Sequence, residues 1–340
     1  MNRLLTFGLA LLCSAMAAQA ASKYDNPDTI VVARDGTGEF RTVTEALEVC
    51  RAFMDYHKVI FVKRGTYKEK IIVPQWLQNI EICGEDRDET IITYDDHANI
   101  PMNLSFWPAE VSRELMKGEQ RPMLGTFRTF TVRVDANGIT FKNITIENNA
   151  AKLGQAVALM TTGDRQRYIN CRLLGNQDTV YTGMPHTRLL FKDCYIEGTT
   201  DFIFGASTAW FENCHIHGKI NSYLTAASTP QDAPFGYVFN NCRVTVDESK
   251  VTNLYLGRPW RDYGYTLFMN CELPRQITPA GWHNWEKHRE QTARYMEYNN
   301  RGEGANTKER VAWSRQLTKK EAQQITMDRV FTMDSVWKAE

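Results

Sequence analysis

A short pattern of apolar and polar positions recurs through the middle of the chain. Each copy has an aromatic residue, any residue, Asn or Asp, Cys, any residue and then an apolar residue. The copies are YINCRLLG (168–175), FKDCYIEG (191–198), FENCHIHG (211–218), FNNCRVTV (239–246) and FMNCELP (268–274). Apolar and polar positions alternate within each copy, and this period indicates a β-strand rather than a helix.

The spacing of the copies indicates how the strands are arranged. Successive cysteines are 23, 20, 28 and 29 residues apart, and FKNITIEN (141–148) repeats the pattern with Ile144 in the cysteine position. A short strand that recurs every 20–30 residues is typical of a solenoid. We therefore expect a parallel β-helix, in which equivalent side chains on successive coils lie ~4.8 Å apart.

The cysteines have two possible roles in such a fold. They could bind a metal, but metal sites use closely spaced pairs of the CxxC type, which the repeat lacks. They could instead stack inside the coils as small buried apolar residues, and this is the interpretation we favour. His215 and His217 lie on one face of a predicted strand. We read them as part of an outward polar face, because no third metal ligand is apparent.

Two segments outside the repeat have helical spacing. Segment 40–53 carries a capping box of Thr42 and Glu45 and is predicted to be an amphipathic helix that covers the N-terminal end of the solenoid. Its apolar positions are Val43, Ala46, Leu47, Cys50 and Phe53. Segment 317–331 predicts a helical tail near the C-terminus, and residues 95–125 break the repeat as a long surface excursion.

The first 20 residues have the features of an export signal. MNRLLTFGLALLCSAMAAQA has Arg3, an apolar stretch too short to span a bilayer, and small residues at Ala18 and Ala20 for cleavage. We expect export to the periplasm or the extracellular space, with residues 21–340 forming one domain. The full chain has 40 basic and 40 acidic residues, which gives no reason to expect a nucleic acid or a membrane as partner.

Two aspartates occupy the same place in the repeat. Asp178, in GNQDTVYTG, and Asp201, in GTTDFIFG, each follow the repeat cysteine of their coil by seven residues. They should therefore stack on adjacent coils, about one strand spacing apart. The same count reaches Asn221 and Ser249 on the next two coils, so the repeat itself does not require an acid.

A pair of stacked carboxylates suits acid–base or nucleophilic chemistry. Two carboxylates ~5 Å apart resist double ionisation, so the pKa of one is raised and one proton is retained. The alternative is a pair of surface aspartates on turns. The apolar neighbours of both residues, such as Val180 and Phe202, weigh against that alternative.

Five segments together resemble the pectin methylesterase (pectinesterase) family. They are GTYKE (65–69), QAVAL (155–159), QDTV (177–180), DFIFG (201–205) and LGRPW (256–260), in the order typical of the family. The resemblance covers nearly all of residues 21–340. It implies an all-β, single-stranded, right-handed parallel β-helix of the pectin-lyase-like type, and a pectinesterase catalytic domain.

The resemblance also implies a role for each matching residue. Asp201 would be the nucleophile that attacks the methyl ester, and Asp178 the proton donor that later activates water. Gln155 and Gln177 would donate hydrogen bonds to the oxyanion of the intermediate.

Two further residues would orient the nucleophile or bind the substrate. The guanidinium of Arg258 would hold Asp201 ionised, and Trp260 would offer a flat apolar face to a galacturonate ring. Gln155 and both of these residues would line the substrate site.

The expected activity is hydrolysis of methyl esters in pectin, releasing methanol, with no metal or other cofactor and with a monomeric enzyme. Three other functions remain open at this point. The chain could be a pectin lyase or polygalacturonase, an acyl esterase or thioesterase on the same scaffold, or a carbohydrate-binding protein without activity. A serine esterase is disfavoured, because the sequence has no G-x-S-x-G motif.

Overall fold

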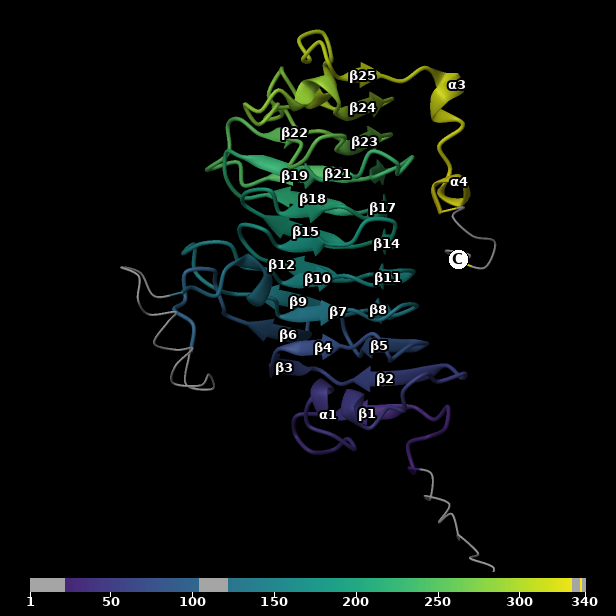
Figure 1. Cartoon of the computed structure of the whole chain (residues 1–340). Helices are drawn as coiled ribbons and strands as arrows, with labels where there is room; N and C mark the ends of the chain where they lie inside the picture. Colours follow the sequence, from purple (N-terminus) through teal and green to yellow (C-terminus); the bar gives the residue numbers. More distant parts are fainter. Residues whose placement is uncertain (1–21, 104–121, 332–336, 338–340) are drawn as a thin grey trace, which may run out of the picture.

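The chain winds as a solenoid of parallel β-strands (Figure 1). The structure is a computed structural model that describes residues 22–103, 122–331 and 337. Each full coil contributes one strand to each of three sheets, which we call sheets 1, 2 and 3 in the order in which the chain visits them. The predicted β-helix is confirmed, with the right-handed crossovers that parallel strands strongly prefer.

Neighbouring strands within each sheet come from successive coils. Sheet 1 contains β1 (Ile30–Val32), β2 (Lys58–Val62), β5 (Ile80–Gly84), β8 (Thr140–Lys142), β11 (Gln166–Ile169), β14 (Arg188–Lys192), β17 (Thr208–Glu212), β20 (Tyr237–Asn240), β23 (Tyr265–Met269), β24 (Arg294–Tyr298) and β25 (Arg315–Gln316). Sheet 2 contains β3 (Gly65–Lys68), β6 (Thr90–Tyr94), β9 (Thr145–Asn148), β12 (Arg172–Leu174), β15 (Tyr195–Gly198), β18 (His215–Gly218) and β21 (Arg243–Val246). Sheet 3 contains β4 (Ile71–Val73), β7 (Val132–Val134), β10 (Leu159–Thr161), β13 (Val180–Thr182), β16 (Ile203–Gly205), β19 (Tyr223–Ala227) and β22 (Tyr255–Gly257).

The repeated aromatic and cysteine positions both point into the solenoid. Adjacent aromatic rings stack with centroids 4.3–5.7 Å apart, in the order Phe141, Tyr168, Phe191, Phe211, Phe239 and Phe268. The five repeat cysteines are buried free thiols, as predicted, and each thiol lies within 3.5 Å of a backbone carbonyl oxygen of the preceding coil. The interior is therefore built from columns of similar side chains.

The Asn or Asp before each cysteine makes the corner between sheets 1 and 2. These residues have φ between 49° and 57°, the left-handed region that Asn and Asp tolerate best among residues with a side chain. They are Asn170, Asp193, Asn213, Asn241 and Asn270; Asn143, before Ile144, and Asn299, after β24, have the same conformation. The corner, rather than any chemistry, explains why the repeat keeps this residue type.

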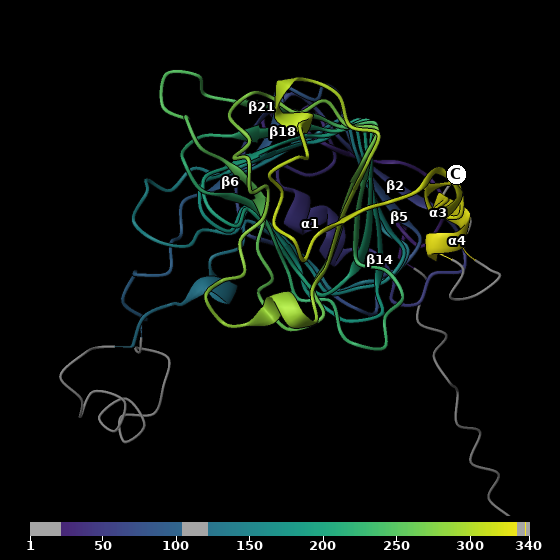
Figure 2. The same ribbon diagram turned by 90° about the horizontal axis from the view of Figure 1, so that it is seen from above.

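The N-terminal helix is shorter than predicted. α1 (Val43–Glu48) has the expected capping box, in which the Thr42 hydroxyl accepts a hydrogen bond from the backbone of Glu45. Four of the five predicted apolar positions are buried, but Phe53 is 70% exposed, so its assignment to the buried face was wrong. Phe53 has a left-handed φ of 55°, beyond the end of the helix. Figure 2 shows α1 beneath the interior enclosed by the three sheets.

The C-terminal tail covers the side of the solenoid (Figure 1). The predicted helix over 317–331 is in fact two short ones, α3 (Lys319–Ala322) and α4 (Met327–Phe331), and the first has a capping box. Val330 and Phe331 of α4 pack in one cluster with outward apolar residues of sheet 1, such as Trp210. The tail therefore buries apolar side chains on the outer face of this sheet.

Two predicted segments fall partly or wholly outside the described residues. The proposed export signal, residues 1–20, is one of them. In the excursion at 95–125, residues 104–121 are also outside, and the described ends meet where Pro101 bridges to Met123. No helix in the described part of the chain is long and apolar enough to cross a membrane.

The aromatic column makes a stability prediction. Phe211 is fully buried between two stacked rings, so Phe211→Ala should lower the free energy of unfolding by about 3–5 kcal/mol. The matched control is Phe53→Ala, because Phe53 is 70% exposed. This control should change the free energy of unfolding by less than about 0.5 kcal/mol. Urea denaturation followed by circular dichroism measures both. Equal losses in the two variants would contradict the stacked packing of the rings.

Candidate active site

Strand register brings the two predicted aspartates together. Val180 of β13 pairs with Ile203 of β16, so Asp178 and Asp201, each two residues before its strand, stand side by side on adjacent coils. The backbone N–H of Asp178 donates to Thr200 O at 3.1 Å, which continues the ladder between the two coils. Both aspartates have positive φ, 66° and 50°, in the left-handed region that Asp tolerates better than most residues with a side chain.

One sequence-based alignment was wrong. Counting from the repeat cysteines placed Asn221 beside Asp201, but the connection into the next strand of sheet 3 is longer than in the preceding coil. Ile203 pairs with Thr225, so the neighbour of Asp201 is Tyr223, whose carbonyl accepts the N–H of Asp201 at 2.9 Å. Ser249 is likewise displaced, because Tyr223 pairs with Tyr255 on the following coil.

Arg258 holds Asp201 through two hydrogen bonds. Its Nε donates to Oδ1 at 3.0 Å and its Nη2 to Oδ2 at 2.7 Å, a fork that matches a carboxylate. Asp201 is 6% exposed, so its charge is removed from water and needs this partner. Arg258 follows β22 closely, and its N–H donates to Thr225 O at 2.9 Å.

The two carboxyls differ in how they are stabilised. Burial, and then the charge of Asp201, raise the pKa of Asp178 to about 8, with Arg258 opposing this only through its charge. Burial also raises the pKa of Asp201, but there Arg258 opposes the rise through hydrogen bonds as well as charge. The retained proton therefore belongs on Asp178 and the negative charge on Asp201. Burial contributes more than the neighbouring charge, on which the expectation from the sequence rested.

The predicted glutamines lie in the same pocket. Gln155 and Gln177 line a cavity of about 250 Å³ together with both aspartates and Arg258. The carbonyl of Gln177 accepts the N–H of Ala156 at 3.0 Å, which joins the two glutamine segments. Neither side-chain amide is hydrogen-bonded to another residue within the described ranges, so both remain free to donate to a ligand.

Aromatic side chains form the walls of the pocket. Trp260 meets Phe204 edge-on with centroids 5.7 Å apart, and Phe127 lies against Tyr181 at 4.9 Å. Trp285 completes the lining. The sequence predicted Trp260 but missed Phe127 and Trp285. Phe127 lies two residues after the excursion at 95–125. This nearness to the break in the repeat is the one feature of the sequence that could have identified Phe127 as a site residue.

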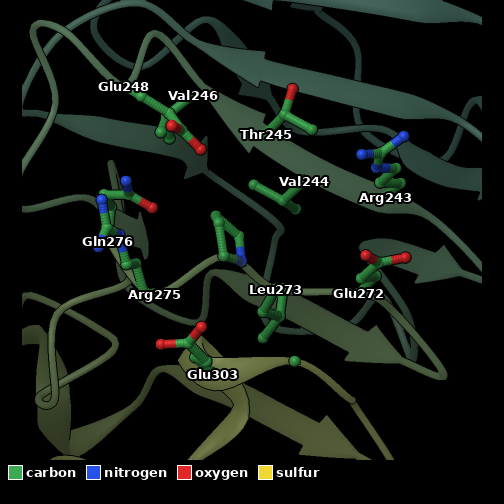
Figure 3. Close-up of a pocket in the computed structure, with 12 residues that line it drawn as sticks. Arg243, Val244, Thr245, Val246, Glu248, Glu272, Leu273, Arg275, Gln276 and Glu303 are labelled. Carbon is green, nitrogen blue, oxygen red and sulfur yellow. The ribbon is translucent and has the colours of Figure 1, made fainter.

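A second groove among the described residues lacks this combination of groups. A larger groove, of about 500 Å³, lies along β21 and the segment after β23 (Figure 3). Its charged lining of Arg243, Glu248, Glu272, Arg275 and Glu303 contains none of the predicted site residues. Elsewhere on sheet 2, His215 and His217 both contact the Thr245 hydroxyl, at 2.6 and 2.8 Å, as members of the outward polar face.

A β-helix with paired carboxylates, an arginine and aromatic walls in one cleft has the features of a polysaccharide-modifying enzyme. The family model "Pectinesterase" matches residues 29–114 and 111–334. Pectinesterase 31 of Arabidopsis thaliana is 36% identical over 295 residues, covering 86% of this chain and 88% of that protein. The chain belongs to the pectinesterase family.

Solved structures agree with this assignment. Pectin methylesterase from carrot superposes with a TM-score of 0.78 at 31% identity, covering 92% of this chain and 95% of that one. A pectin methylesterase in complex with a hexasaccharide superposes with a TM-score of 0.74 at 26% identity, covering 92% and 98%. The chain also spans about half the length of longer plant relatives described as pectinesterase/pectinesterase inhibitor.

The half-buried carboxyl of Asp178 predicts how stability depends on pH. Asp178 has a pKa of about 8 when folded and, like any exposed aspartate, about 3.9 when unfolded. The folded chain therefore holds a proton that the unfolded chain has lost, and stability falls as the pH rises through this window. Asn cannot ionise, so Asp178→Asn should remove this loss of stability with pH. It should raise the free energy of unfolding at pH 8 by about 1–3 kcal/mol.

The gain in the Asp178→Asn variant should be smaller at pH 5 than at pH 8. Denaturant unfolding at both values measures the difference, with Asp232→Asn, at an exposed carboxylate, as the control. A variant that is less stable than the wild type at pH 8 would contradict the raised pKa.

Proposed function

We propose that the enzyme hydrolyses methyl esters on galacturonate units of pectin, releasing methanol and leaving free carboxylates. The single observation that carries this is the adjacent pair Asp178 and Asp201, with Arg258 holding one member by two hydrogen bonds. Such a pair offers an ionised nucleophile beside a protonated acid in one cleft.

In the first half of the reaction, an oxygen of Asp201 attacks the ester carbonyl carbon. The oxyanion that forms accepts hydrogen bonds from the side-chain amides of Gln155 and Gln177, which both face the cavity. When the bond from carbon to the methoxy oxygen breaks, Asp178 gives its proton to that oxygen and methanol leaves. Asp201 is then joined to the galacturonate carbonyl as an anhydride.

In the second half, the roles of Asp178 reverse. The carboxylate of Asp178 takes a proton from water, and the water oxygen attacks the galacturonate carbonyl carbon. The bond to Asp201 breaks, which restores both carboxyls and releases the free uronic acid. A pKa of about 8 suits Asp178 to both steps near neutral pH, because it can give and regain a proton there.

The aromatic walls suit a polysaccharide chain. Trp260, packed edge-on against Phe204, offers a flat face on which a galacturonate ring can stack. Nothing in this mechanism requires a metal ion. We further propose that residues 1–20 direct export, that residues 21–340 act as one monomeric catalytic domain, and that the enzyme works in the periplasm or outside the cell, where pectin is found.

The central test is methanol release from methyl-esterified pectin with a chelator present. Asp201→Ala should lower kcat by at least about 10³-fold, because it removes the nucleophile itself. The matched control is Asp164→Asn. Asp164 forms another two-bond pair, with Arg188, at 3.0 and 2.6 Å, and it is not among the residues that line the catalytic pocket. This control should keep its activity per folded molecule.

Three results would overturn the proposal. Full activity of Asp201→Ala would reject the assigned nucleophile. A wild-type enzyme that leaves pectin methyl esters intact but cleaves acetyl esters or thioesters would favour the acyl esterase or thioesterase alternative. Binding of pectin without turnover of any ester would favour the alternative of a carbohydrate-binding protein without activity.

The oxyanion assignment has its own test. Gln177→Ala removes one donor and should lower kcat by about 10²-fold while leaving KM nearly unchanged, since the oxyanion exists only after attack. Steady-state kinetics on the same pectin separate the two parameters. A rise in KM with unchanged kcat would mean that Gln177 binds the ground state of the substrate instead.

A further inference from the structure

Arg258 lies between two aromatic rings. Its guanidinium carbon is 3.9 Å from the ring centroid of Tyr223 and 3.7 Å from that of Trp285. At these separations a planar guanidinium stacks on the ring faces, and the cation is attracted to both π systems. One edge of the same guanidinium donates to Asp201. The group is thus fixed on both faces and along one edge.

Tyr223 is itself supported from behind. Its ring stacks on Tyr255 with centroids 5.2 Å apart and an interplanar angle of 26°, and the ring of His283 meets it edge-on at 5.5 Å. The stack follows from strand register, because Tyr223 and Tyr255 continue the column of side chains that contains the two aspartates. Tyr223 is not among the residues that line the pocket with the carboxyls.

Trp285 is held over Arg258 by a strained loop. Trp285, Glu286 and His288 have φ values of 63°, 54° and 56°, in the left-handed region that residues with a side chain rarely adopt. The loop is tied down where the ring of His283 accepts the N–H of Trp285 at 3.0 Å and where Arg289 donates to Pro259 O at 2.9 Å. Such clustered strain persists only where the surrounding structure enforces it.

A long arginine side chain needs this kind of restraint to act as a fixed partner. Free arginine has many rotamers, and ordering it opposes the formation of the fork with Asp201. Rings on both faces leave the guanidinium one plane in which to lie. In that plane its Nε and Nη2 meet the two carboxylate oxygens.

We infer that Tyr223 and Trp285 are positioning residues that clamp the guanidinium of Arg258 flat against Asp201. The ring of Tyr223 contacts Arg258 and does not line the pocket with the carboxyls, whereas Trp285 both contacts Arg258 and lines that pocket. The clamp makes Asp201 a better-defined nucleophile and keeps it ionised to lower pH. This inference rests on the proposed function for the catalytic role of Asp201, but the geometry of the clamp does not.

A sugar-binding role for Tyr223 can be separated from the clamp by experiment. Tyr223 lines a neighbouring groove of about 290 Å³ with His283, Lys287 and other residues, where a second sugar ring could bind. A residue that binds sugar affects KM. A residue that positions Arg258 affects kcat and the pH at which Asp201 becomes ionised. The groups that interact electrostatically with Asp201 are Asp178, Arg258, Tyr223 and Tyr295.

The kinetic test compares Tyr223→Leu with Tyr223→Phe on methyl-esterified oligogalacturonides. Tyr223→Leu removes the ring and should lower kcat about tenfold with KM within about twofold of wild type. The acid limb of kcat/KM should move up by about half a pH unit, because Asp201 loses part of its stabilisation as an anion. Tyr223→Phe keeps the ring and should behave like wild type. Tyr195→Leu, at a partly exposed tyrosine on sheet 2, is the control for folding.

A second measurement is independent of activity. The Nε–H of Arg258 should give a protected, slowly exchanging NMR signal in the wild type and in Tyr223→Phe, and should lose that protection in Tyr223→Leu. Trp285→Leu, which opens the other face, should lose it as well. If the wild type does not act on pectin, the proposed function fails while this measurement still decides whether the clamp exists.

Three results would overturn the clamp. One is a Tyr223→Leu enzyme with a raised KM but unchanged kcat and acid limb. Another is a Tyr223→Phe enzyme as impaired as Tyr223→Leu, which would assign the effect to the hydroxyl. The last is an Arg258 signal that is equally protected in all variants.

Discussion

The register between neighbouring coils determines most of this molecule. Parallel pairing places equivalent residues of successive coils about 4.8 Å apart, so any residue type repeated in the sequence becomes a column in space. Inside the solenoid this produces stacked rings and buried thiols. At the edge of sheet 3 the same register produces the pair Asp178 and Asp201, followed by Tyr223 and Tyr255. One pairing rule therefore builds both the core and the site.

The site places two acids where a purely structural coil has no need of them. Asp201 is buried and Asp178 beside it is half-buried, and desolvation opposes the charge of both. Arg258 compensates one of them through a two-bond fork, which leaves the other to hold a proton. The rest of the solenoid, with its continuous ladders, supplies the rigidity that keeps these unfavourable groups in place.

Much of this could be read from the sequence, for identifiable physical reasons. The Cys-containing repeat defined the coil length closely enough to pair Asp178 with Asp201, because the two coils have connections of equal length. The next connection is longer, and counting then reached Asn221 where the structure has Tyr223. Phe53 fitted a helical period, but the helix ends at Glu48 and the chain turns outward. Phe127 lies in a 3-10 helix of three residues and Trp285 in a loop, and both segments are too short or irregular for a period to predict which way a side chain points.

The proposed chemistry depends on the two carboxyls sharing one proton in a common cleft. The most direct measurement is an NMR titration of the Asp178 carboxyl carbon in the wild type and in Asp201→Asn. We expect a pKa near 8 in the wild type, and a lower value in the variant that still exceeds the ordinary aspartate range, because burial remains. The claim that the two carboxyls share one proton would be contradicted by an ordinary aspartate pKa for Asp178 in the wild type. It would also be contradicted by a pKa of Asp178 that Asp201→Asn leaves unchanged.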